Sequence, residues 1–277
     1  MRNMSFCCAS CVVACKVDER RILEGSISMI KLNGHVVKPT IFPDGTSQVW
    51  KQPLDEGNAG VVEWEFENEA EVFHVLQACH LARKYFGHVR LVVNYLPYGR
   101  QDKSVDNEKT FALRTLGLSL AAVGVSEIVT VDAHSQLLAE PGMKLKLTSI
   151  FPGERIVDVI AECGANMACY PDKGAFQRYS SIDMKSIVLE KARDQTTGVI
   201  TGMDVVDGDV AEDDVVLIVD DICDGGASFI AAAKELKELA DVTVHLYVSH
   251  GIFSKGLDVL REAGIERIFT YEKELAL

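Results

Sequence analysis

The sequence predicts an α/β protein of two domains, each built on a central, mostly parallel β-sheet flanked by helices. Apolar runs rich in valine, such as VRLVVNYL at 89–96, are typical of strands covered on both faces. Segments with apolar residues three and four positions apart alternate with these runs, which is the pattern of strands joined by helical crossovers. The chain has 277 residues, a length that suits one large domain or two of ordinary size, and we favour two.

The expected elements follow in order along the chain. The first clear helix is expected over 68–86, where apolar residues from Val72 to Phe86 recur at helical spacing and Gly87 ends the pattern. The further expected helices cover 110–123, 152–162, 227–239 and 254–263. The expected strands cover 89–96, 127–133, 215–220, 242–249 and 266–271, and one more ends at Tyr170. The least patterned central stretch, 139–154, indicates a boundary, so we expect domains at 1–145 and 146–277.

The composition limits the classes of partner. Acidic residues number 41 against 28 basic ones, a net charge of −13, so we expect no nucleic-acid partner. No apolar run approaches the roughly 18 residues that span a bilayer, so we expect no membrane partner. Cys8 and Cys11 have the spacing that begins a zinc site, but no second pair completes it. We therefore interpret the eight cysteines as reduced thiols of a cytoplasmic protein.

Polar residues stand at the ends of several predicted strands. In a parallel α/β sheet the ligand binds at the carboxyl ends of the strands, so these residues are the candidates for a site. They are NYLPYGRQDK at 94–103, Asp132 with His134, Asp172 with Lys173 and Gly174, and Asp220 with Asp221.

The stretch VVLIVDDICDGGASFI at 215–230 has the features of a phosphate site. Two carboxylates end the apolar run, the residues from Asp224 to Ser228 turn without bulky side chains, and a helix is expected to begin at once. Free backbone N–H groups at a helix start, the positive end of its dipole and the Ser228 hydroxyl would together bind a phosphate, and a bulky residue at Gly226 would block it. The alternative is a plain connection in which Asp220 and Asp221 cap the helix and the glycines only turn. Five ordered features in nine residues favour the phosphate site.

This stretch resembles the 5-phosphoribosyl diphosphate signature of type I phosphoribosyltransferases and ribose-phosphate pyrophosphokinases. NYLPYGRQDK at 94–103 resembles the pyrophosphokinases' Pro-Tyr-x-x-Arg-Gln-Asp-Arg segment, and TVDAHS at 130–135 is similar to their Val-Asp-Leu-His stretch. Three more segments are near motifs of that family in the same order, namely IFPDG at 41–45, YPDKGAFQRY at 170–179 and SHGIFSKG at 249–256. The resemblance implies two phosphoribosyltransferase-like (type I) domains, with a nucleotide side at 1–145 and a ribose 5-phosphate side at 146–277.

The resemblance also implies roles for individual residues. It places ATP at Arg100, Gln101 and Asp102, with Phe42 and Asp44 reaching the nucleotide of a neighbouring subunit. It places Mg²⁺ at His134 and Asp172, although a histidine at a strand end can equally pack or cap. It places the ribose hydroxyls at Asp220 and Asp221, and the 5-phosphate at Asp224, Gly225, Gly226, Ala227 and Ser228. Lys191 and Arg193 match the Lys-x-Arg of a mobile catalytic loop; the alternative is a pair of solvated charges on a surface hairpin.

The implied reaction moves the diphosphate of ATP to the 1-hydroxyl of ribose 5-phosphate, giving 5-phosphoribosyl 1-diphosphate and AMP, in a homo-oligomer of two or more subunits. Such a transfer mainly needs well-placed cations rather than a covalent intermediate. The chain departs from the family at Thr46, where the family has glutamate, and at Lys173 and Phe176, where it has small residues. Three alternatives stay open: a larger acceptor such as ADP-ribose, whose second phosphate Lys173 would accommodate, a phosphoribosyltransferase, and a catalytically silent regulatory homologue.

Overall fold

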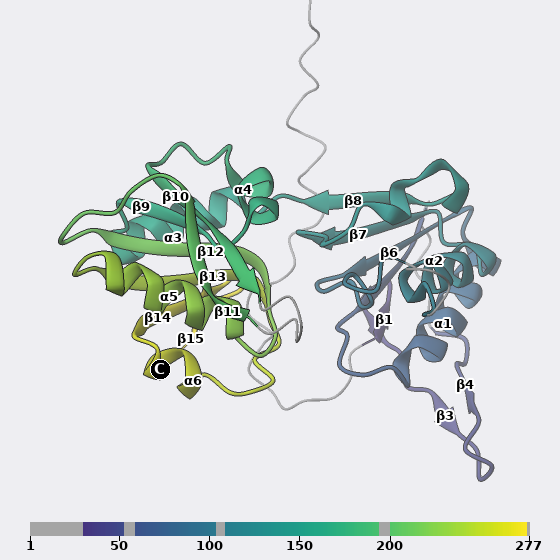
Figure 1. Cartoon of the computed structure of the whole chain (residues 1–277). Helices are drawn as coiled ribbons and strands as arrows, with labels where there is room; N and C mark the ends of the chain where they lie inside the picture. Colours follow the sequence, from purple (N-terminus) through teal and green to yellow (C-terminus); the bar gives the residue numbers. More distant parts are fainter. Residues whose placement is uncertain (1–29, 53–58, 104–108, 194–199, 276–277) are drawn as a thin grey trace, which may run out of the picture.

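The chain forms two lobes, each built around one β-sheet (Figure 1). The computed structural model describes residues 30–52, 59–103, 109–193 and 200–275, and the side chains of 192–201 are outside this description. In the described chain, the first lobe (residues 30–150) holds a six-stranded sheet and the second lobe (residues 153–275) a seven-stranded sheet. These two mostly parallel sheets with flanking helices confirm the predicted α/β fold class.

The first sheet has the strand order β2-β1-β5-β6-β7-β8. Its parallel strands are β5 (Ala59–Trp64), β6 (His88–Val93), β7 (Glu127–Val131) and β8 (Lys146–Ile150). Antiparallel strands extend one edge, namely β1 (Ile30–Leu32) and β2 (His35–Val36). The helical elements are α1 (Glu71–Tyr85), α2 (Ala112–Ala122), η2 (Leu137–Ala139) and η3 (Pro141–Met143). A separate hairpin at the outer end of the lobe consists of β3 (Thr40–Ile41) and β4 (Ser47–Gln48) (Figure 1).

The first sheet buries only one face fully, which corrects the expectation for 89–96. Val89, Leu91 and Val93 are at most 1% exposed, whereas Arg90 and Val92 on the other face are half-buried. The reason is that α1 and α2 pack against the same core as these three residues. Continuous apolar character therefore did not distinguish a strand covered on one face from one covered on both.

The second sheet is the more deeply buried of the two. Its order is β11 (Ile200–Asp207), β10 (Ser186–Arg193), β9 (Met167–Tyr170), β12 (Val215–Cys223), β13 (Thr243–Gly251), β14 (Ile265–Thr270) and β15 (Glu274–Leu275). The helices of the lobe are α3 (Gly153–Cys163), α4 (Lys173–Tyr179), α5 (Ala227–Leu239) and α6 (Asp258–Glu262). Along β12, Val216 and Ile218 belong to the core under α5, and Leu217 and Val219 belong to the core that contains residues of α3 and α4. Alternate side chains of this strand therefore fill two separate cores.

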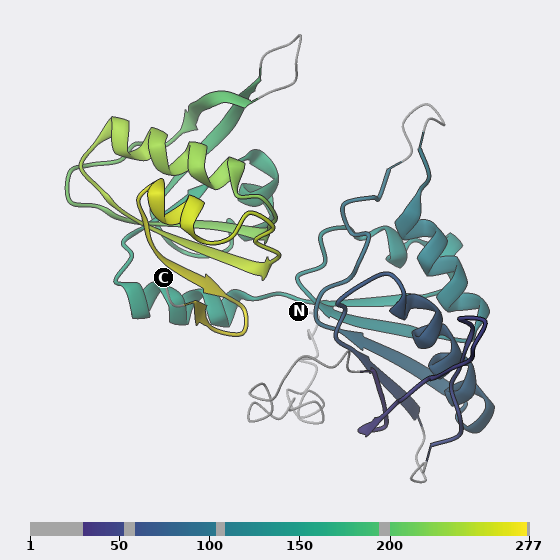
Figure 2. The ribbon, with the colours of Figure 1, turned by 90° about the horizontal axis from the view of Figure 1, so that it is seen from below.

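The sheets divide the chain later than the expected boundary between residues 145 and 146. Strand β8 follows that boundary, yet it pairs in parallel with β7 of the first sheet from Lys146 to Ile150. The chain then passes to α3 of the second lobe through Phe151 and Pro152 (Figure 2). That each lobe is an independent domain remains a prediction. Among the described helices, none has the length and apolar character needed to cross a bilayer.

Candidate active site

A cavity of about 310 Å³ lies where the carboxyl ends of strands from both lobes meet. Arg100 and His134 contribute to its wall from the first lobe. The second lobe contributes Asp172 and some of the residues of α4 that follow it, Lys191 of β10, most of the segment from Asp220 to Phe229, and Lys255. The cavity therefore lies at the edge where the strand-end rule places a ligand, and binding there stays a prediction.

The segment after β12 forms the floor of this cavity. β12 runs to Cys223, so Asp220 and Asp221 lie inside the strand, and Asp220 is paired in register with Val248 of β13. The chain then turns at Gly226, whose φ of 78° is in the left-handed region that favours glycine, and α5 begins at Ala227. The first N–H groups of a helix have no partner within it, so this turn presents backbone donors beside the cavity.

The two aspartates of β12 differ in electrostatic environment. Burial and the charge of Asp221 raise the pKa of Asp220. Burial acts in the same direction on Asp221, but the hydrogen bond and charge of His134 and the charge of Arg178 outweigh it and lower the pKa of Asp221. Asp221 is therefore the carboxylate of the pair, and Asp220 is the group that more readily holds a proton. Together they offer carboxyl oxygens to neighbouring sugar hydroxyls.

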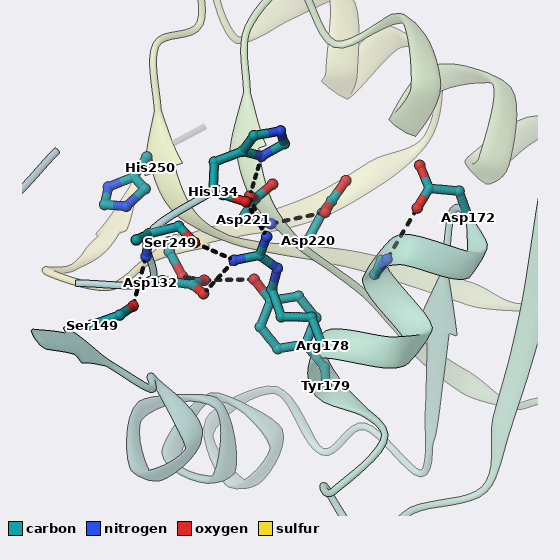
Figure 3. A network of polar contacts seen from close by, with 12 residues as sticks. Asp132, His134, Ser149, Asp172, Arg178, Tyr179, Asp220, Asp221, Ser249 and His250 are labelled. Atoms are coloured by element: carbon teal, nitrogen blue, oxygen red, sulfur yellow. Dashed lines mark hydrogen bonds and ion pairs between the residues drawn. The ribbon is translucent and has the colours of Figure 1, made fainter. Parts of the chain in front are cut away.

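His134 reaches Asp221 from the opposite lobe. Its Nδ1 lies 2.6 Å from Oδ2 of Asp221, and Figure 3 shows the two side chains meeting across the lobe boundary. This hydrogen bond raises the pKa of His134, and burial opposes it. The imidazole side chain remains 37% exposed and lines the cavity. Its contact with Asp221 leaves Nε2 as the ring nitrogen available to a ligand.

Asp172 and Lys191 form an ion pair on the cavity wall. Oδ1 of Asp172 accepts a hydrogen bond of 3.0 Å from the N–H of Ala175 and so caps α4, while Oδ2 accepts one of 3.0 Å from Nζ of Lys191. Burial raises the pKa of Asp172, but these hydrogen bonds dominate and lower it. The Lys191 side chain is only 20% exposed, so it is not a solvated charge, although it does lie on the β10–β11 hairpin. Arg193 ends β10, and its side chain lies outside the described residues.

The residues expected to bind the nucleotide are not gathered in one place. Arg100 lines the cavity, and its Nη1 lies 3.4 Å from Oδ2 of Asp224 in the second lobe. Gln101 and Asp102 follow directly, but neither lines the cavity. Phe42 and Asp44 lie on the β3–β4 hairpin, where Asp44 accepts hydrogen bonds from the N–H and hydroxyl of Thr46. This hairpin is remote from the cavity of the same chain, so a role for it in nucleotide binding remains a prediction about a neighbouring subunit (Figure 1).

The chemistry of the cavity wall fits magnesium bound together with a substrate. Within the described ranges, no three His, Cys, Asp or Glu side chains are grouped as a ready-made metal site. Mg²⁺ usually binds through one or two carboxylates plus substrate phosphates, and Asp172 and His134 offer such an incomplete set. The suggested zinc pair, Cys8 and Cys11, lies outside the described residues. Burial raises the pKa of the Cys79 thiol to about 12, which is unfavourable for metal binding by the thiolate.

Two charged residues of the cavity wall were not among the sequence candidates. Arg178 of α4 contacts Asp221 and the segment that carries His134. Lys255 lies over the loop from Asp224 to Ser228, which we call the candidate phosphate loop. The aliphatic stem of Lys255 is so close that a Cβ added at Gly225 would be 3.4 Å from its Cε. Both residues occur in segments that resemble family motifs, YPDKGAFQRY and SHGIFSKG, and this was the available signal.

The fold and the cavity define a class of protein: two-lobed α/β proteins with two mostly parallel sheets and a polar cavity between the lobes. A phosphoribosylpyrophosphate synthetase from Mycobacterium smegmatis has the same fold, with a TM-score of 0.69 and 21% identity over 85% of this chain and 79% of that one. The ribose-phosphate pyrophosphokinase of Thermococcus kodakarensis is 31% identical over 248 residues, which are 85% of this chain and 82% of the relative. That of Pyrococcus abyssi is 28% identical over 260 residues, 90% and 86% of the two chains. No family model matches the chain. The chain belongs to the ribose-phosphate pyrophosphokinase family.

Proposed function

We propose that the protein is a ribose-phosphate diphosphokinase that transfers the diphosphate of ATP to the 1-hydroxyl of ribose 5-phosphate. The observation that supports this most is that cations of both lobes line one cavity together with the loop after β12. Arg100 comes from the nucleotide side, Lys191 and Lys255 come from the ribose side, and the loop between them has the form of a phosphate site.

The proposed reaction forms one bond and breaks one. The 1-hydroxyl oxygen attacks the β-phosphorus of ATP, the bond from that phosphorus to the α,β-bridging oxygen breaks, and AMP leaves with the electron pair while the hydroxyl proton passes to solvent. Negative charge develops on the phosphoryl oxygens and on AMP, and fixed cations stabilise it. Lys191 and Arg100 are the cavity cations that we assign to this role.

The acceptor would be held at both ends. Backbone N–H groups at the start of α5 and the hydroxyl of Ser228 bind the 5-phosphate, and Asp220 and Asp221 bind the ribose hydroxyls. Mg²⁺, held by His134 and Asp172 together with the substrate phosphates, would neutralise phosphate charge when bound. Because Lys191 occupies an oxygen of Asp172, its ammonium has to move before that oxygen can bind a metal.

A larger acceptor is not favoured by the structure. Lys173, the residue that would bind a second phosphate, pairs with Glu190 at 3.1 Å and is not among the residues that line the cavity. In the proposed homo-oligomer, the β3–β4 hairpin with Phe42 and Asp44 would lie next to the cavity of a neighbouring subunit.

The test is AMP release from ATP and Mg²⁺ with ribose 5-phosphate, with ADP-ribose or without acceptor, followed by chromatography and phosphorus NMR of the product. AMP formed only with ribose 5-phosphate, and lost with a chelator, supports the proposal. AMP formed only with ADP-ribose assigns the larger acceptor. No AMP with either acceptor overturns a diphosphokinase and leaves a silent homologue or a phosphoribosyltransferase. Release of diphosphate from 5-phosphoribosyl diphosphate and a nucleobase would then identify the latter. Lys191→Ala should release AMP about 100-fold more slowly, and Lys173→Ala, which removes a cation outside the cavity, should stay active.

A further inference from the structure

A buried carboxylate lies at the boundary between the lobes. Asp132 follows β7 with a φ of 43° and is 3% exposed. It accepts hydrogen bonds of 2.5 Å from the hydroxyls of Tyr179 and Ser249, and one of 3.2 Å from Nη1 of Arg178 (Figure 3). All three donors belong to the second lobe. Both of its oxygens are engaged in these contacts, so Asp132, two positions before His134, joins the two lobes.

Arg178 extends this network to the cavity. Its Nη1 also donates to the carbonyl oxygen of Ala133 at 2.8 Å, and its Nη2 donates to the carbonyl oxygen of His134 at 2.8 Å. Nη2 lies 3.4 Å from Oδ2 of Asp221 as well. A planar guanidinium is the side chain that can hold several acceptors in one fixed arrangement. Arg178 thus contacts the backbone at His134 and also the Asp221 carboxylate, to which the His134 side chain is hydrogen-bonded.

The shared contact determines how Asp221 lies in the cavity. Oδ2 of Asp221 receives both Nδ1 of His134, at 2.6 Å, and Nη2 of Arg178, at 3.4 Å. Both contacts are thus made by the same oxygen, which fixes the orientation of the carboxylate in the cavity wall. Figure 3 shows Arg178 between Asp132 and Asp221, with Tyr179 beside it. Removing the Arg178 side chain would remove its contact with Oδ2 of Asp221. The link from that carboxylate through the guanidinium to Asp132 would also be lost.

We propose that Arg178, anchored on Asp132, is a positioning residue that sets the orientation of Asp221 and His134 across the lobe boundary. This inference rests on the proposed function, because it supposes that Asp221 binds the acceptor. Displacing a substrate-holding group by about 1 Å can cost about 100-fold in rate. We therefore expect Arg178→Gln to lower kcat by 10- to 100-fold, with a change of at most threefold in the affinity for ATP.

The control is Tyr179→Phe. This change removes one donor to Asp132 but no contact to Asp221 or His134, so it perturbs the same buried network without the proposed positioning link. We expect Tyr179→Phe to lower the melting temperature and to leave kcat within about twofold of the wild type. Equal losses of kcat in Tyr179→Phe and Arg178→Gln, in proportion to the loss of stability, would show that Arg178 is only structural.

A crystal structure of Arg178→Gln tests the position directly, whether or not the wild type turns over ATP. The expected result is a displaced Asp221 carboxylate and a lost contact to His134, and an unchanged Asp221 would overturn the inference. If Arg178→Gln does not fold, Arg178→Lys provides the same test, because it keeps the charge but cannot reach all the acceptors. A wild type that forms no AMP would overturn the proposed function and leave this crystallographic result standing.

Discussion

Gly226 allows the structure of the candidate phosphate loop to be tested separately from its function. Alanine at φ 78° lies in the left-handed region, which costs about 1–2 kcal/mol for a residue with a Cβ. The added Cβ would be 2.9 Å from Cδ2 of Leu260, a side chain that is 1% exposed. Overpacking of this kind costs about 1–3 kcal/mol, and we take the lower half because the contact is with the end of a side chain. We therefore expect Gly226→Ala to lower the free energy of unfolding by about 2–4 kcal/mol.

Urea unfolding followed by circular dichroism measures this change, and Gly225→Ala is the matched control. A Cβ at Gly225 would be in ordinary contact with the Lys255 stem, at 3.4 Å and beyond, and Gly225 has no positive φ. We expect this variant to keep its stability within about 1 kcal/mol and to bind ribose 5-phosphate more weakly in calorimetry. A Gly226→Ala chain as stable as the wild type would refute the loop geometry.

The structure also changes the meaning of a bulky substitution at Gly226. Its Cβ would meet Leu260 and Ile230 in the core beneath the loop. Loss of phosphate binding in such a variant would therefore report a distorted fold, whereas the sequence suggested a blocked pocket. Gly225→Ala is the more informative change, and unaltered affinity for ribose 5-phosphate in that variant would count against the loop as the phosphate site.

Three further outcomes are expected. Lys191→Ala should lower turnover by about 100-fold in steady-state assays while calorimetric ATP affinity stays nearly constant, and an unchanged kcat would contradict its assignment. Lys255→Ala should raise the KM for ribose 5-phosphate by roughly 10-fold with little change in kcat, because the cation lies over the candidate phosphate loop. A KM equal to that of the wild type would exclude a role of Lys255 in binding the 5-phosphate. Burial raises the pKa of Glu127, but hydrogen bonds from Lys146, Arg90 and Thr148 outweigh it and lower the pKa to about 2. The stability from this group is present above the ordinary value of 4.5 and is lost as pH falls from there toward 2. The free energies of unfolding of the wild type and Glu127→Gln, measured in urea, should thus differ by up to about 3 kcal/mol at pH 6 and by much less at pH 3. A difference that does not depend on pH would contradict the lowered pKa of Glu127.

The elements with strong periodicity were the ones that the sequence predicted. The helix expected over 68–86 is α1 at Glu71–Tyr85, and the one expected over 227–239 is α5 with the same bounds. The short strands β1 to β4 and β15 and the strands β5 and β8 were not predicted, and a hairpin at β10–β11 was considered only as an alternative for Lys191 and Arg193. The short strands span only two or three residues, too few for a pattern to be recognised, and the hairpin shows neither a long apolar run nor a strict alternation of apolar and polar residues. α4 was also missed, because seven residues are too few to show a helical period.

The site was predictable where it depends on strand ends and not where it depends on how the lobes meet. His134 and Asp172 follow strands, Asp220 and Asp221 lie near the carboxyl end of β12, and all four line the cavity. Arg178 lies inside a short helix, and its partners come from the other lobe more than forty positions earlier in the chain and from β12. Contacts of this kind have no local sequence pattern, so the structure was needed to find them.

In the described chain, the polypeptide passes from one lobe to the other once, through Phe151 and Pro152. Cutting the chain there would leave every strand pairing of both sheets intact, and the covalent link would act only as a tether that keeps the lobes at high local concentration. Two polypeptides made separately, ending and starting at this point, should then reassemble through the Asp132 contacts when mixed. The same arrangement would permit one gene to be divided into two, each product supplying half of one cavity.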